Sequence, residues 1–166
     1  MAITPGRQAA SLALGLLVGS LVLMSSVGTR AQANSSLGAW TLNVAKSKYS
    51  PGPPPMSETR VYEAFGTGGV KATFNRVGAK GEKTTITYSA MYDGTDYKYV
   101  GSPDADSITL RLVNENTTEA VLKLTGKVMQ TTKAVVSADG RTRTLTTSGV
   151  NAKGQKVNNT VVFDRQ

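Results

Sequence analysis

The amino-acid sequence predicts an all-β protein, an antiparallel up-and-down meander of about 8–10 strands that closes into a β-barrel. Three observations support this fold class. From Ser57 onward, apolar and polar residues alternate with a period of two. Turn residues such as Gly, Asp and Asn recur about every 8–12 residues. No useful length of chain repeats apolar residues at the 3.6-residue period of an amphipathic helix.

The first expected strand, in residues 38–43, contains Trp40, the only Trp of the chain. The pair Asp93-Gly94 predicts a tight turn, because both residue types tolerate a positive φ. Further strands are expected at 61–65, 70–75, 84–91, 97–100, 108–112, 120–124, 129–137, 141–148 and 157–165.

A proline-rich segment, Pro51–Pro55, separates the first two expected strands. Proline cannot donate a hydrogen bond to a strand ladder and favours extended polyproline geometry, so the segment predicts a stiff loop. Two interpretations stay open: a flap or recognition segment at the mouth of a barrel, or a simple connector.

Closure into a barrel removes the strand edges that an open sheet would expose. The strand expected at 141–148 has no purely apolar face, because threonines and a serine alternate with Arg141, Arg143 and Leu145. Such a strand fits a barrel with a partly polar interior better than a dry sandwich core.

Residues 1–33 have the pattern of a signal peptide. Arg7 precedes an apolar stretch, 9–24, and a small-x-small motif ends at Ala33. The stretch is shorter than the roughly 20 residues that cross a bilayer, which favours cleavage near Ala33 over a permanent anchor. We therefore expect a secreted or periplasmic protein whose residues 34–166 form one domain.

The chain has 19 Lys and Arg against 11 Asp and Glu, a formal net charge of +8. A basic surface attracts anions, so the expected partners include anionic membranes or cell-surface polymers, contacted peripherally. Nucleic acid is not expected, because the basic residues are spread along the chain and an export signal precedes them. We expect a monomer that is stable without disulfides, since the chain has no Cys.

The chain also has no His. Without His and Cys it cannot form a Ser-His-Asp triad, a thiol nucleophile or a zinc site of the usual type. No phosphate-binding loop motif is present. We therefore expect neither an enzyme nor a cofactor; chemistry by carboxylates or Lys is the alternative that the sequence leaves open.

Four acidic residues form a candidate calcium site, on two loops that flank one short strand. Hard cations bind several carboxylates at once, and two adjacent loops could supply them. The competing interpretation is that Asp is simply a good turn residue. The four residues are Asp93, Asp96, Asp104 and Asp106.

Aromatic, Met and Arg side chains on the expected strands form a candidate ligand-binding site. Aromatic walls with a few polar tips suit an amphipathic ligand, although ordinary core packing would use the same residues. An inward-facing Arg would need an anionic partner, because an unpaired buried charge is very costly. The candidates are Tyr62, Phe74, Tyr88, Met91, Tyr92, Tyr99, Arg111, Met129 and Arg143.

Gly38-Ala39-Trp40 resembles the G-x-W motif of the lipocalins and the wider calycin group, and Thr95-Asp96-Tyr97 resembles the lipocalin T-D-Y motif. The resemblance implies that Arg165, near the end of the last strand, packs over Trp40 and closes the barrel. Residues 40–52 are also similar to small exported bacterial proteins of unassigned function.

The chain departs from these families in four ways. Its T-D-Y motif comes after about four strands, earlier than in lipocalins, and no C-terminal helix follows the last strand. That strand lacks the Arg-x-Tyr with which fatty-acid-binding proteins hold a carboxylate. The proline-rich loop takes the place of their two-helix lid.

The sequence thus predicts an exported lipocalin-like protein that binds a small hydrophobic or amphipathic ligand, with anionic ligands among the candidates, and does not transform it. The alternative is a cavity-free, envelope-associated structural or interaction module that acts through its basic surface.

Overall fold

A computed structural model of the protein describes residues 1–2 and 34–166. The signal peptide expected at 1–33 therefore lies outside the described residues, apart from its first two. No helix in the described part of the chain is long and apolar enough to cross a bilayer. The ten strands are β1 (Gly38–Lys48), β2 (Ser57–Phe65), β3 (Gly69–Val77), β4 (Lys83–Ala90), β5 (Asp93–Val100), β6 (Ser107–Asn114), β7 (Thr117–Leu124), β8 (Lys127–Val136), β9 (Thr142–Val150) and β10 (Lys156–Arg165).

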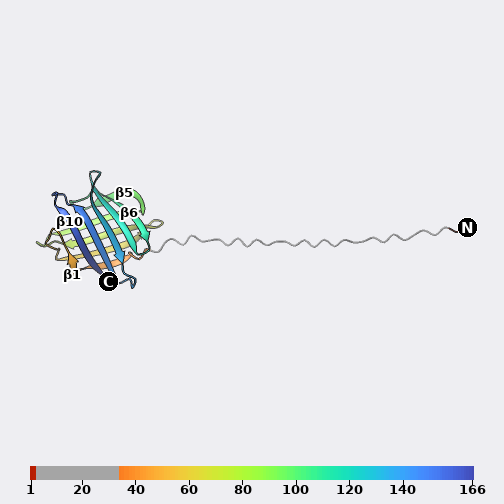
Figure 1. Cartoon of the computed structure of the whole chain (residues 1–166), viewed down its shortest axis with the longest axis horizontal. Helices are drawn as coiled ribbons and strands as arrows, with labels where there is room; N and C mark the ends of the chain where they lie inside the picture. Colours follow the sequence, from red (N-terminus) through yellow and green to blue (C-terminus); the bar gives the residue numbers. More distant parts are fainter. Residues whose placement is uncertain (3–33) are drawn as a thin grey trace.

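The strands form one closed antiparallel barrel. Each strand pairs with the next in sequence, and β10 returns to pair with β1. At this closing seam Trp40 lies opposite Arg165, and Leu42 lies opposite Phe163. Figure 1 shows the later strands, cyan to blue, crossing in front of the earlier ones, yellow to green. The predicted all-β meander and its closure are confirmed.

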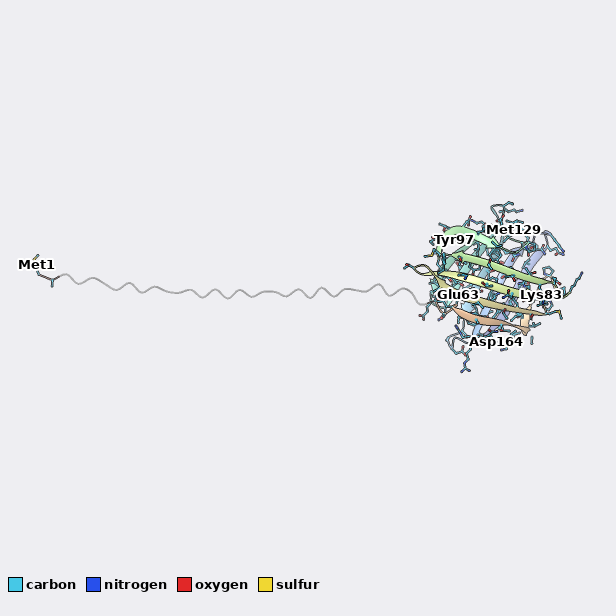
Figure 2. The ribbon with its side chains drawn as sticks, turned by 180° about the vertical axis from the view of Figure 1, so that it is seen from behind. Met1, Glu63, Lys83, Tyr97, Met129 and Asp164 are labelled. Atoms are coloured by element: carbon cyan, nitrogen blue, oxygen red, sulfur yellow. The ribbon has the colours of Figure 1, made fainter. Side chains whose placement is uncertain are left out.

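The barrel has two ends, which we call the floor and the mouth. The floor carries the turns between β2 and β3, β4 and β5, β6 and β7, and β8 and β9; the mouth carries the other five connections. In Figure 2, Glu63 near the end of β2 and Lys83 at the start of β4 mark these opposite ends. Residues 34–37 lead into β1 at the floor.

Alternate residues of each strand point into the barrel, as the two-residue period of a strand requires. In β2 the inward face is not the apolar one: Glu58 and Tyr62 are buried, whereas Val61 and Phe65 are exposed. The largest fully buried side chains are Trp40 and Phe163, at the closing seam. Most of the large buried apolar side chains therefore lie at the seam and along β3 and β4. The inward face of β2 adds a buried charged residue, Glu58, to this core.

The barrel wall is weakest between β4 and β5. These strands pair only at Thr87–Val100 and Tyr88–Tyr99, whereas β3 and β4 pair along their whole length. Just after β5, Gly101 adopts a φ of +90° and lies against β4, where a Cβ would be 2.0 Å from the Thr85 carbonyl oxygen. Glycine is required there because no other residue allows so close an approach.

Candidate ligand-binding site

A cavity of about 460 Å³ occupies the barrel interior. This volume lies within the range of about 300–1,000 Å³ that is typical of small-molecule sites. The cavity reaches the mouth, where Pro51, Gly78 and Ser102 line it, and it extends down to Tyr92 and Arg143 at the floor end. The fold therefore encloses space rather than a filled core.

Four aromatic side chains from the neighbouring strands β2 to β5 form one wall of the cavity. The ring centroids of Tyr62 and Phe74 are 5.5 Å apart, those of Phe74 and Tyr88 5.8 Å, and those of Tyr88 and Tyr99 5.8 Å. Burial raises the pKa of Tyr99 to about 12 and raises that of Tyr88 as well. Both hydroxyls are therefore protonated at neutral pH and give this apolar wall polar tips.

The opposite wall, from β6 to β10, mixes aliphatic and small polar side chains. Together with the aromatic wall it makes an interior that suits an amphipathic molecule. Its lining residues include Ile108, Leu110, Ala120, Leu122, Leu145 and Val161 on the apolar side, and Thr118, Gln130, Thr132, Thr147 and Asn159 on the polar side.

Glu58 and two arginines form an ion-pair cluster in the barrel. The Oε1 atom of Glu58 is 2.5 Å from Arg60 Nε, and its Oε2 atom is 2.7 Å from Arg76 Nε. Burial raises the pKa of Glu58, but the two guanidinium groups lower it by more, so the net shift is downward. Burial lowers the pKa of Arg60, but the Glu58 carboxylate together with Tyr62 and Tyr99 raises it by more, so the net shift is upward. All three groups are therefore charged, and the cluster carries a net positive charge.

Arg60 of this cluster packs between two aromatic rings. The Cζ atom of Arg60 lies 4.3 Å from the ring centroid of Phe74 and 4.6 Å from that of Phe163. Cation–π contacts of this kind stabilise a guanidinium that has lost its water. The cluster thus joins the aromatic wall to the closing seam.

Arg143 of β9 is a second buried cation, with 6% of its surface exposed. Its Cζ atom lies 4.1 Å from the ring centroid of Tyr62. Its Nη2 atom donates a long hydrogen bond of 3.5 Å to Thr118 Oγ1. Its Nε and Nη1 atoms are buried and have no acceptor among the residues that the structure describes.

The proline-rich loop lines the mouth through Pro51, Pro53 and Pro55. Its first part is fastened to β10, because the Ser50 amide donates to Asn159 Oδ1 at 2.8 Å. Tyr49, at its start, has a buried hydroxyl with no partner in the described part of the chain. Burial and then the nearby Glu58 carboxylate raise the pKa of Tyr49 to about 12, so this hydroxyl is also protonated.

The floor is closed by Trp40, which is fully buried, and by Arg165. The Cζ atom of Arg165 lies 4.3 Å from the Trp40 ring, as the resemblance to lipocalins implies. Arg165 also donates to the carbonyls of Leu37 at 2.9 Å and Ser35 at 2.7 Å, and the Trp40 indole donates to that of Ser36 at 2.9 Å. These contacts hold the segment before β1 across the floor.

Most of the ligand-binding candidates named from sequence line the cavity. Three do not. Arg111 is exposed on the outer face of β6, while its neighbour Leu110 points inward. Met91 lies in the β4–β5 turn beside Gly69, and Met129 lines a shallow groove on the outside between β8, β9 and β10. The six that line the cavity are Tyr62, Phe74, Tyr88, Tyr92, Tyr99 and Arg143.

The four acidic residues of the candidate calcium site do not come together. Asp93 and Asp96 lie at the floor end of β5, and Asp104 and Asp106 lie at the mouth. Each has local partners; for example, Asp96 accepts from Lys123 Nζ at 2.8 Å. No group of three or more acidic side chains with the geometry of a metal site occurs among the described residues. Asp93, Asp104 and Asp106 lie at or beside turns, as the competing interpretation expects, whereas Asp96 lies within β5.

Sequence reasoning missed the ion-pair cluster of Glu58, Arg60 and Arg76. The available signal was their spacing: Glu58, Arg60 and Tyr62 follow one another at i and i+2, so they share one face of a strand. Arg76 stands two residues after Phe74 on the next strand, on the same side. Strands rarely turn charged side chains toward the interior. Hydrophobic alternation therefore gives no sign that a strand does so.

Comparisons of the chain with protein-family models, with curated proteins and with solved structures found no match. The fold and the site therefore define the class of protein. It is a closed, ten-stranded antiparallel β-barrel with an internal cavity, compatible with the barrels of the calycin group.

Proposed function

We propose that the protein is an exported, lipocalin-like barrel that binds a small hydrophobic or amphipathic ligand and does not transform it. The observation that carries this proposal is the cavity of about 460 Å³, with its aromatic wall and few polar tips. The lack of His and Cys supports binding without catalysis. The pattern of residues 1–33 supports export.

A second candidate is an envelope-associated module that acts through its basic surface. The net charge of +8 favours it. The internal cavity disfavours the filled barrel that this candidate assumes. Sedimentation with anionic vesicles that disappears at high salt, together with an empty cavity, would favour this candidate over the carrier.

The carrier proposal is tested by displacement of the neutral fluorescent probe N-phenyl-1-naphthylamine. We expect the probe to brighten on binding the protein and fatty acids or isoprenoids to displace it. Ala120 lines the cavity and Val121 follows it on the outer face of β7. Ala120→Phe should therefore weaken probe binding about tenfold or more, whereas Val121→Phe should not, provided that both variants melt cooperatively. No brightening, and no small molecule in mass spectra of the natively exported protein, would contradict the proposal.

A further inference from the structure

Arg143 is the deepest charge in the barrel that has no counter-ion. Only 6% of its surface is exposed, and Nε and Nη1 find no acceptor in residues 34–166. Nε carries one N–H and Nη1 carries two, so three strong donors are unsatisfied in a site that water reaches poorly. Leaving a buried charged donor unpaired is costly, and such groups in folded proteins mark a missing partner.

No acidic side chain of the barrel interior can supply that partner. Both oxygens of Glu58 are already occupied, one by Arg60 and one by Arg76. The acidic residues that line the cavity, Glu82 and Asp104, belong to loops of the mouth, at the end of the barrel away from Arg143. The interior charges therefore sum to a positive value.

The neighbours of Arg143 hold it in place without neutralising it. The Cζ atom of Arg143 lies 4.1 Å from the Tyr62 ring centroid, a cation–π contact that stabilises the charge but does not neutralise it. The Tyr92 hydroxyl, which is neutral and therefore no counter-ion, accepts a hydrogen bond from Asn34 Nδ2 at 2.6 Å. Arg143 lines the cavity, and none of these neighbours supplies the negative charge that it lacks.

We propose that the ligand is an anionic amphiphile whose acidic group sits on Arg143 at the floor end of the cavity, with its apolar part lying along the aromatic wall toward the mouth. This inference rests on the proposed carrier function and names its ligand class. A carboxylate matches the planar donors of a guanidinium in charge and shape.

Arg143, rather than Arg76, selects the anion. The side chain of Arg76 is 38% exposed and paired with Glu58, so water and that carboxylate already compensate its charge. Arg143 has neither compensation. An anion bound there gains the full benefit of a charge-assisted contact in a poorly solvated site.

The chemical class is tested with dodecanoate, dodecanol and dodecylamine, each displacing N-phenyl-1-naphthylamine from the exported protein below its micelle concentration. We expect dodecanoate to bind about tenfold to a hundredfold more tightly than dodecanol, and dodecylamine to bind more weakly than either. Arg143→Met should remove this preference, so that dodecanoate and dodecanol bind with about equal affinity. Arg111→Met, the same change on the outer face of β6, should retain it.

Orientation is tested through the single Trp. Trp40 lies at the floor, and bromine quenches an indole only at short range. Dodecanoate brominated next to its carboxylate should therefore quench Trp40 more strongly than dodecanoate brominated at its far end. Stronger quenching by the far-end compound would overturn the orientation.

The remaining outcomes separate the two proposals. Equal affinity for dodecanoate and dodecanol would overturn the anion site and leave the carrier standing. A preference for dodecanoate that survives Arg143→Met would also overturn it, since the anion would then sit elsewhere. Failure of all three compounds to displace the probe would overturn both. An unchanged or raised melting temperature for Arg143→Met would show that the lost binding is not lost folding.

Discussion

The most informative single residue is Glu58, because it holds two arginines inside a barrel wall. Its side chain is 1% exposed, and each carboxylate oxygen contacts a different guanidinium. The pair with Arg60 is the more consequential, since the side chain of Arg60 is 14% exposed whereas that of Arg76 is 38% exposed. Removing the carboxylate would leave a poorly hydrated cation between two rings.

We predict that Glu58→Gln lowers the free energy of unfolding by about 3–5 kcal/mol, as expected when one partner of a buried ion pair is removed. Urea denaturation measures this. Glu63→Gln is the matched control on the same strand: its carboxylate is 59% exposed and lies 3.6 Å from Lys71, so the loss should stay within about 1 kcal/mol. Equal losses in the two variants would mean that the cluster does not stabilise the fold.

At the scale of the strand, the β4–β5 junction depends on a glycine that comes after β5. Because these strands share only two residue pairs, the approach of Gly101 to the Thr85 carbonyl helps to hold β5 against β4. Gly126, in the β7–β8 turn, has a similar φ of +80° but nothing within 4 Å of where a Cβ would lie. Both glycines have a positive φ, but only Gly101 is in close contact with another strand. Comparing the two therefore distinguishes the cost of a steric clash from the cost of the backbone conformation.

We predict that Gly126→Ala costs about 1–2 kcal/mol, the price of a left-handed conformation, and that Gly101→Ala costs about 2–5 kcal/mol, because strands must also move apart. Urea denaturation gives both values. Hydrogen exchange should quicken in β4 and β5 for Gly101→Ala alone. Identical stability of the two variants would show that this junction is already loose.

At the scale of the whole molecule, closure makes the barrel one cooperative unit whose stability responds to pH through its buried charges. The pKa of Glu58 is lowered in the folded state from an ordinary value of 4.5, despite burial, by Arg60 and Arg76. A depressed carboxyl pKa contributes stability that is fully present above the unfolded-state pKa and is lost as pH falls through the folded-state pKa.

We therefore predict that the urea midpoint of the protein falls as pH is lowered from about 5 to about 2, and that Glu58→Gln shows a shallower fall over the same window. The exposed carboxylates titrate in both proteins, so the difference between the two curves isolates Glu58. Parallel curves would show that Glu58 does not contribute to the acid sensitivity of the fold.

Local sequence patterns determined most of the architecture of this protein. Alternation and turn residues indicated the all-β meander and a strand count of about 8–10, where the structure has ten. Closure was inferred because it removes exposed strand edges and fits the partly polar strand at 141–148. The resemblance to lipocalins paired Trp40 with Arg165, and the two residues are in contact. The fold class and the strand count can be predicted without knowing which face of each strand points into the barrel.

Only the tertiary structure decided which face of each strand points inward. Arg111 and Arg143 have similar sequence surroundings, yet one is exposed on the outer wall and the other is buried at the floor. In β2 the charged face turned inward because Glu58 is neutralised by Arg76 of β3, a partner 18 residues away. Whether a charged face can be buried depends on partners that other strands supply. The alternation within a single strand does not indicate those partners.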